Sequence, residues 1–182
     1  MIQRDLVSYL QAAKINTDIA PLANLDYDAV DLNYVSQVWS AWVESLDISL
    51  KERVMVCGPG YDTNGKQTID AVYQWQPKYL LPSFDCAQMA FSFTNAMILG
   101  SAQAASKEAG SGKPVRNTPA FGYIYFAISK GSYMGDQNVG FRHAINWFLD
   151  FNNQVHFFEK QTGNEVKLTQ DEVSSIFSLV AS

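Results

Sequence analysis

The sequence predicts an α+β domain, in which helices come first along the chain and an antiparallel sheet follows. Three observations predict this class. Apolar residues recur at helical spacing in the first half, over 30–46 and from 86 to about 105. The second half changes to short β-branched and aromatic runs, at 121–129, 142–150 and 155–159. A chain of 182 residues is typical of one domain, so we expect a single domain over 1–182.

Residues 1–78 are expected to form a helical N-terminal part. A short helix is predicted over 6–14 and a second over 30–46, with Asp26 and Asp28 as N-cap candidates. The second helix has an apolar stripe that reads as core: Val35, Val38, Trp39, Trp42, Val43 and Leu46. The stretch 53–57 resembles a short strand, and 68–75 fits either a strand or a helical turn.

Residues 79–182 are expected to form a central helix packed on an antiparallel sheet. The helix starts near Cys86 and contains strong helix formers and few helix-breaking residues to about residue 105. The segment 106–119 is polar and reads as an exposed connection. Its 110–113 stretch, GSGK, suggests a phosphate loop, but the full spacing fails and the stretch follows a helix. A last helix is predicted over 169–180, because Thr169 and Glu172 form a capping-box pattern.

Composition and charge exclude several classes of partner. The net charge is −5 and the isoelectric point is about 4.9, and the 13 Lys and Arg residues are scattered. We therefore expect neither a nucleic acid nor a membrane surface as partner. No signal peptide or long apolar span is visible, and two cysteines, Cys57 and Cys86, suit a reducing compartment. A cytoplasmic location is expected, which includes a viral protein acting in a host cell.

Cys86 is the first candidate for chemistry. It lies in the first turn of the predicted central helix, with Ser83 or Asp85 as the cap. Unpaired N–H groups and the positive end of the helix dipole favour thiolate over thiol at this position. A backbone N–H in this turn is also a candidate donor to an oxyanion. The alternative is a cysteine that is buried only for packing.

His143 and Glu159 are the second candidate pair, because they lie on consecutive predicted strands in apolar surroundings. If the turn centres on Phe151, the two residues lie directly opposite each other, with Cβ atoms about 5 Å apart. A two-residue turn at Asn152-Asn153 would instead place them on opposite faces of the sheet. The turn residues allow both registers. A carboxylate in such apolar surroundings usually has a partner, because burying it alone would be costly.

Three segments, taken in order, resemble one family. They are YLLPSFDC at 79–86, RHAIN at 142–146 and FFEKQTG at 157–163. Together they look like the papain-like cysteine-peptidase domain that is fused to the fairy-ring mushroom agglutinin, and like its stand-alone microbial and viral relatives. The resemblance implies a papain-like or transglutaminase-like core. It also implies Cys86 as nucleophile, His143 as general base, Glu159 as the orienting acid and Gln161 as a supporting residue.

The sequence departs from the family pattern at two points. Ala87 and Gln88 stand where the family commonly has two aspartates, with calcium implicated in activation, so we expect no metal or other cofactor. The glutamine that precedes the cysteine in papain-type enzymes is missing here. Gln74 and Gln76 are the remaining candidates for an oxyanion donor, and Gln76 is the candidate that we assign.

The sequence gives little support for a functional role of His156 or for a zinc site. His156 points to the opposite face of its predicted strand from Phe157, and we expect it to have a structural role. A zinc site that combines Cys57, Cys86, His143 and His156 lacks the usual close-spaced ligand pair.

The sequence thus predicts a cysteine hydrolase that cleaves an amide or peptide bond through a thioester, with a protein or peptide as substrate. Two alternatives remain open. The same order of Cys, His and acid suits transglutaminase-like acyl transfer. The missing carboxylates and glutamine suit a catalytically inactive module that binds proteins.

Overall fold

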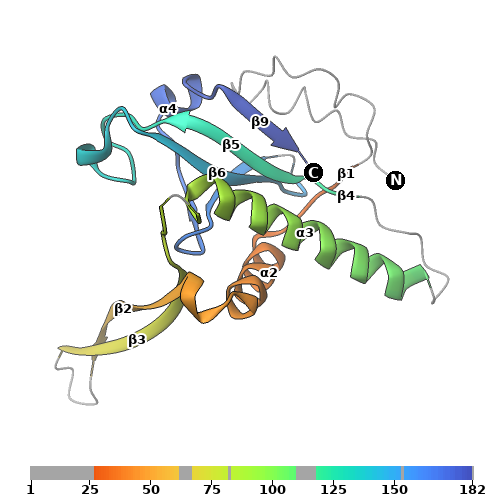
Figure 1. The fold of residues 1–182 in the computed structure, drawn as a ribbon, viewed down its shortest axis with the longest axis horizontal. Helices are drawn as coiled ribbons and strands as arrows, with labels where there is room; N and C mark the ends of the chain where they lie inside the picture. The colour runs from red at the N-terminus through yellow and green to blue at the C-terminus, as the bar shows by residue number, and fades with distance from the viewer. Residues whose placement is uncertain (1–26, 62–66, 82, 110–117, 153, 182) are drawn as a thin grey trace.

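A five-stranded sheet with two helices on one face forms the centre of the molecule (Figure 1). The computed structural model describes residues 27–61, 67–81, 83–109, 118–152 and 154–181. The strands lie in the order β8-β7-β6-β5-β9, each antiparallel to its neighbours. Their bounds are β5 Phe121–Ala127, β6 Arg142–Leu149, β7 Val155–Glu159, β8 Asn164–Val166 and β9 Ser178–Ala181. The two helices are α2 (Leu32–Ser45) and α3 (Cys86–Ala109). The predicted α+β class is confirmed.

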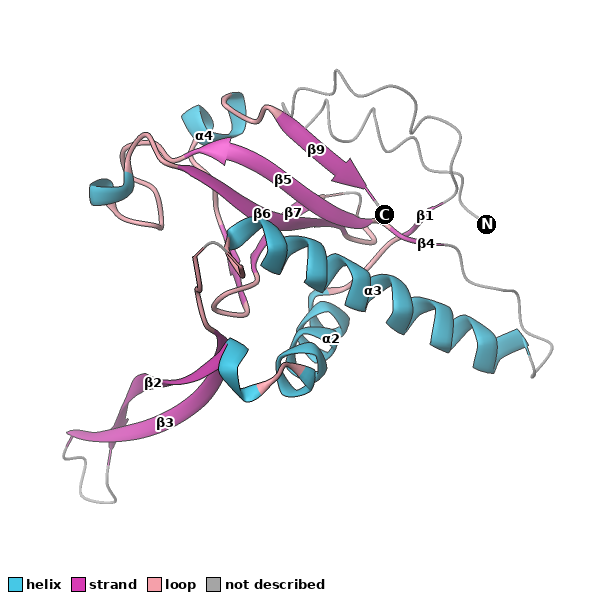
Figure 2. Ribbon diagram, in the orientation of Figure 1, coloured by secondary structure: helices cyan, strands magenta, loops and turns pink. Residues whose placement is uncertain are grey.

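The N-terminal part is only partly helical, which corrects the prediction for 1–78. After a 3₁₀ turn at Ile48–Leu50, strands β2 (Lys51–Tyr61) and β3 (Gln67–Pro77) pair as a long antiparallel hairpin that projects from the body (Figure 2). The ambiguous stretch 68–75 is therefore strand, as its Thr, Ile, Val and Tyr residues favour. The helix expected over 6–14 lies outside the described residues. Strand β1 (Tyr27–Asp28) pairs in parallel with β4 (Thr118–Pro119).

The N-cap of helix α2 lies later in the chain than either of the two predicted residues. Asp31, and neither Asp26 nor Asp28, is the N-cap, because its carboxylate accepts the Tyr34 N–H at 2.8 Å. Asp28 is unsuited to this role because it belongs to β1, where it pairs with Pro119. The predicted core stripe is confirmed at four positions that are buried in α2: Val35, Trp39, Trp42 and Val43.

The sheet separates two hydrophobic clusters, as the alternation along β6 predicts. On the helix-covered face, Phe93 of α3 packs its ring 5.3 Å from Trp42, 5.3 Å from Phe121 and 5.6 Å from Phe158. Along β6, Phe148 belongs to this cluster, whereas its neighbours Trp147 and Leu149 point to the opposite face. The other cluster contains Ile124, Phe126, Ile145, Trp147, Leu149, Ile176 and Leu179.

The C-terminal segment corrects the helix predicted over 169–180. Thr169 and Glu172 form the expected capping box, but α4 spans only Gln170–Ser174. The chain then extends as β9 and pairs with β5, whose edge would otherwise lack partners. Tertiary pairing thus overrides the helical pattern of the last residues.

Within the described residues, no helix combines the length and apolar character needed to cross a membrane.

Candidate active site

Asp85 fixes the start of α3, and with it the position of Cys86. Its carboxylate accepts the N–H groups of Ala87 at 2.8 Å and Gln88 at 3.1 Å. The Gln88 side chain in turn accepts the Asp85 N–H at 3.1 Å, which completes a capping box. Of the two predicted caps, Asp85 and not Ser83 therefore has this role. Cys86 is the first helical residue and half-buried, and across the described chain no hydrogen bond engages its own N–H.

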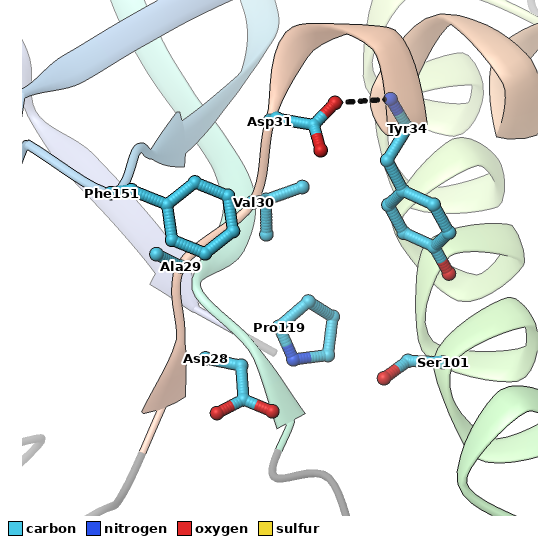
Figure 3. A pocket seen from close by; sticks show the side chains of 8 residues that line it. All are labelled: Asp28, Ala29, Val30, Asp31, Tyr34, Ser101, Pro119 and Phe151. Carbon is cyan, nitrogen blue, oxygen red and sulfur yellow. Dashed lines mark hydrogen bonds between the residues drawn. The ribbon is translucent and has the colours of Figure 1, made fainter. Parts of the chain in front are cut away.

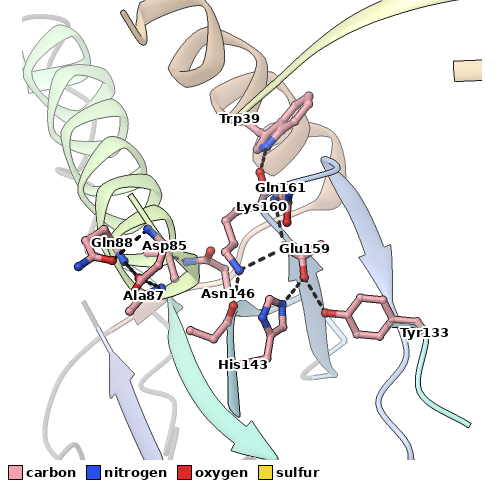
Figure 4. Close-up of polar contacts among 12 residues, drawn as sticks. Trp39, Asp85, Ala87, Gln88, Tyr133, His143, Asn146, Glu159, Lys160 and Gln161 are labelled. Atoms are coloured by element: carbon pink, nitrogen blue, oxygen red, sulfur yellow. Dashed lines mark hydrogen bonds and ion pairs between the residues drawn. The ribbon is translucent and has the colours of Figure 1, made fainter. Parts of the chain in front are cut away.

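His143 and Glu159 lie together in the interior, as Figure 4 shows. The His143 Nε2 is 2.7 Å from the Glu159 Oε2, and both residues are buried, with exposed fractions of 5% and 2%. The predicted pairing is therefore present in the structure. The two residues are not directly opposite, however, and the strand register is neither of the two that the sequence left open.

The observed register explains how the pair still meets. Leu149 pairs with Val155 and Asn146 with Phe158, so the hairpin centres on Asn152. Continued by one position, this register places Glu159 beside Ile145, two residues from His143 along β6. A displacement of two residues keeps both side chains on one face, within reach of a diagonal contact.

The Glu159 carboxylate takes part in three hydrogen bonds and one ion pair. Oε2 accepts from His143 and from the Tyr133 hydroxyl at 2.6 Å. Oε1 accepts from the Gln161 N–H at 3.1 Å and lies 3.2 Å from the Lys160 Nζ. Burial alone raises the pKa of Glu159, but the Lys160 charge and the His143 and Tyr133 hydrogen bonds outweigh it and hold the pKa well below its ordinary value. Glu159 is therefore a permanent carboxylate.

Lys160 is the site residue that the sequence analysis missed. It is completely buried, and its Nζ donates to the Ala144 carbonyl as well as pairing with Glu159. Its own carbonyl accepts the Trp39 indole N–H at 2.7 Å, which ties it to α2. The sequence carried no signal for it, because β7 ends at Glu159 and strand alternation does not extend to residue 160.

The surroundings of Cys86 favour a thiolate beside an imidazolium. Burial raises the pKa of Cys86, but the hydrogen bond to His143, the Lys160 charge and the Ala144 N–H together bring it below the ordinary value. Burial and Lys160 lower the pKa of His143, whereas the hydrogen bonds to Cys86 and Glu159 raise it, and the net direction is upward. Since Nε2 faces Glu159, Nδ1 is the nitrogen left for the thiol.

The glutamines expected near the site lie in different places. Gln161 follows the acid and supports it through its backbone N–H. Gln76 lies in β3 opposite Glu52, and among the described residues no contact joins its side chain to Cys86. Gln74 borders a pocket with Trp39 on the α2 side.

Asn146 attaches the cysteine helix to the sheet. From β6, its Nδ2 donates to the Ala90 carbonyl at 3.1 Å, the Thr94 hydroxyl at 3.0 Å and the Gly122 carbonyl at 3.1 Å. Two of these acceptors lie on α3 and one on β5. The side chain is completely buried, so these bonds fix α3 relative to the strand that carries His143.

The turn after β7 holds the acid in place. The Gly163 N–H donates to the Glu159 carbonyl at 2.8 Å, and Gly163 has a φ of +74°. The Trp39 ring lies so close that a Cβ at Gly163 would be 2.7 Å from it. Glycine is therefore required here, both for the left-handed backbone and for the space.

The remaining candidates lie outside this site. His156 lies between the carboxylates of Glu165, at 2.6 Å, and Asp150, at 3.2 Å, and stacks on Phe148. The described residues contain no group of three or more His, Cys, Asp or Glu that could hold a metal ion. The side chain of Cys57 and the stretch 110–113 lie outside what the structure describes.

A separate pocket lies between β1, β4 and α3, and its lining residues are drawn in Figure 3. Its lining carries two carboxylates, Asp28 and Asp31, of which Asp31 already caps α2. The described lining of this pocket contains neither a cysteine nor a histidine.

The chain matches no family model, and a search of curated proteins finds no match. The assignment of a function therefore depends on the geometry of the site.

Proposed function

We propose that this chain is a cysteine hydrolase that cleaves an amide or peptide bond through a Cys86–His143–Glu159 triad. One observation carries the proposal: the buried His143 is held at 2.7 Å by the buried Glu159 carboxylate, and its interaction with Cys86 at the start of α3 helps to lower the pKa of that thiol. Nucleophile, base and orienting acid in this order are the requirement for acyl chemistry at a thiol.

In the first half of the proposed reaction, the Cys86 thiolate attacks the carbonyl carbon of the substrate. The carbonyl π electrons move to oxygen and form an oxyanion. The Asp85 carboxylate binds the N–H groups of Ala87 and Gln88, and the Cys86 N–H is the donor that we propose for this oxyanion. The His143 imidazolium then protonates the leaving amine as the carbon–nitrogen bond breaks, and a thioester remains on Cys86.

In the second half, neutral His143 takes a proton from water, and the resulting hydroxide equivalent attacks the thioester carbon. The oxyanion forms again and collapses, the carbon–sulfur bond breaks, and a carboxylic acid leaves. Cys86 and His143 return to the thiolate–imidazolium state. Glu159 keeps the imidazole in one orientation throughout, because its Oε2 binds Nε2.

The arrangement of elements supports a papain-like core as the finer description of the fold. The helix that carries Cys86 packs against an antiparallel sheet that carries His143 and Glu159 on adjacent strands. The motifs that resemble the papain-like family lie at the helix start and on those two strands. We propose proteins or peptides as substrates on the same grounds.

The proposal is tested by digestion of a complex peptide library and identification of new chain ends by mass spectrometry. Wild-type protein should generate new ends, Cys86→Ala should generate none, and Cys57→Ala, the matched loss of the other cysteine, should keep the activity. An added primary amine separates hydrolysis from acyl transfer, since transfer would attach the amine to the new carboxyl end. Equal digestion by wild type and Cys86→Ala, or an intact library with both, would contradict the proposal.

A further inference from the structure

We propose that Lys160 is a positioning residue that sets the pH window in which the Cys86–His143 pair works, by holding a fixed positive charge behind Glu159. This inference depends on the proposed function, because it concerns the same triad.

The geometry fixes the ammonium group at this place. Lys160 is completely buried, and its Nζ lies 3.2 Å from the Glu159 Oε1 while it also donates to the Ala144 carbonyl. The Trp39 indole holds the backbone carbonyl of the same residue at 2.7 Å. A lysine whose ammonium group and backbone carbonyl are both bound is held in place beside the acid.

The positive charge of Lys160 weakens the influence of Glu159 on proton binding by His143. A buried carboxylate needs a balancing cation. If His143 were the only cation near Glu159, the imidazole would hold its proton too strongly to act as a base toward water. Lys160 balances Glu159 in both protonation states of His143, so the imidazole can give its proton to a leaving group and later accept another.

Lys160 also acts on the nucleophile. Its ammonium group binds the carbonyl of Ala144, the residue that follows His143 on β6. The positive charge lowers the pKa of Cys86 and that of His143 alike. It therefore moves both boundaries of the thiolate–imidazolium state toward lower pH.

Other ionisable groups face the pair from several elements, and they remain unchanged in the test below. They comprise Asp85 at the start of α3, Tyr79 before it, Tyr125 on β5, and Tyr133 in the loop before β6, which is itself influenced by Glu172 on α4.

The test measures two midpoints. The iodoacetamide alkylation rate of Cys86, followed by mass spectrometry across pH, gives the midpoint of thiolate formation. Histidine NMR, with His156→Gln to assign the signals, gives the midpoint of His143. Lys160→Met keeps the length of the side chain and removes the charge, so both midpoints should rise by about one pH unit. Lys167→Met removes an exposed lysine as the matched control and should leave both midpoints unchanged.

The outcomes separate the two proposals. If wild-type Cys86 titrates like an ordinary thiol near pH 8.5, the proposed function fails. If wild type titrates low but Lys160→Met has the same midpoints, only the role of Lys160 is wrong. If Lys160→Met does not fold, Glu159→Gln is compared with the double variant Glu159→Gln/Lys160→Met. Higher midpoints in the double variant support the inference, and identical midpoints overturn it.

Discussion

His143 and Glu159 form a 2.7 Å hydrogen bond from diagonal positions of the β6–β7 ladder, and not from directly opposed ones. The diagonal arrangement leaves room on the same carboxylate for Tyr133, whose hydroxyl also binds Oε2. The acid is therefore held from the base, from a loop and from its own turn. Each of these contacts can be removed separately.

Tyr133→Phe removes one donor from Glu159 and keeps the ring. We expect the free energy of unfolding to fall by about 1.5–3 kcal/mol, the usual net contribution of a hydrogen bond to a charged group. The turnover of the substrate found in the library digestion should fall several-fold, because the acid orients His143 less firmly. Tyr73→Phe, on the exposed face of the β2–β3 hairpin, is the matched control. Equal turnover in the two variants would show that the Tyr133 hydroxyl does not support the acid.

Gly163→Ala tests the turn that carries Glu159. Both Gly163 and Gly140 have positive φ, at +74° and +87°, so alanine at either costs about 1–2 kcal/mol of backbone strain. Only at Gly163 would the new Cβ meet the Trp39 ring, which adds about 1–3 kcal/mol of overpacking.

Urea unfolding of the two alanine variants measures the difference. Gly163→Ala should be the less stable and should also lose activity, whereas Gly140→Ala should lose stability only. Similar losses of stability in both variants would argue against the contact with Trp39.

Asn146→Ala should separate the cysteine helix from the sheet. The substitution removes three hydrogen bonds to buried acceptors on α3 and β5. We expect the free energy of unfolding to fall by about 2 kcal/mol, because buried acceptors lose their partner. Asn152→Ala, at an exposed turn, is the control, and its effect should be smaller. Alkylation of Cys86 at pH 6 should slow in Asn146→Ala alone, and an unchanged rate would contradict the proposed anchoring.

His156 gives a pH dependence of stability that is independent of catalysis. Burial lowers its pKa, but the carboxylates of Glu165 and Asp150 outweigh burial, so the pKa is raised in the folded state. The stabilisation is therefore fully present below about pH 6.5, the value of an unfolded histidine, and is lost as the pH rises through the higher folded value.

Urea unfolding at pH 6 and pH 8.5 checks the sign. The stability difference between wild type and His156→Gln should be larger at pH 6. A difference that stays constant, or that grows toward pH 8.5, would contradict the proposed ion pairs of His156.

Much of the fold follows from local sequence patterns. The apolar stripe of α2 and the alternation of β6 are local, and both are confirmed in the structure. The segment 178–181 shows the limit of such patterns, since its strand depends on the distant edge of β5. The cap of α2 was misplaced because Asp28 and Asp31 both suit an N-cap, and only the pairing of β1 with β4 distinguishes them.

The site was predictable to a similar degree. Cys86 carries a local helix-start signal, and the neighbouring strands bring His143 and Glu159 together. The register could not be derived, because Asn and Asp residues at 150–153 suit several turns. Lys160 was missed because its partner, the Ala144 carbonyl, is a backbone atom that no sequence pattern marks.

His143 is proposed to make a reactive thiolate of Cys86. The alkylation rate of Cys86 by iodoacetamide, measured at pH 6 in wild type and in His143→Ala, tests this proposal. We expect fast alkylation in wild type, about tenfold or more above the variant, because an unassisted thiol of pKa about 8.5 is almost fully protonated at this pH. Equal and slow alkylation of the two proteins, with Cys86 reacting only above pH 8, would contradict it.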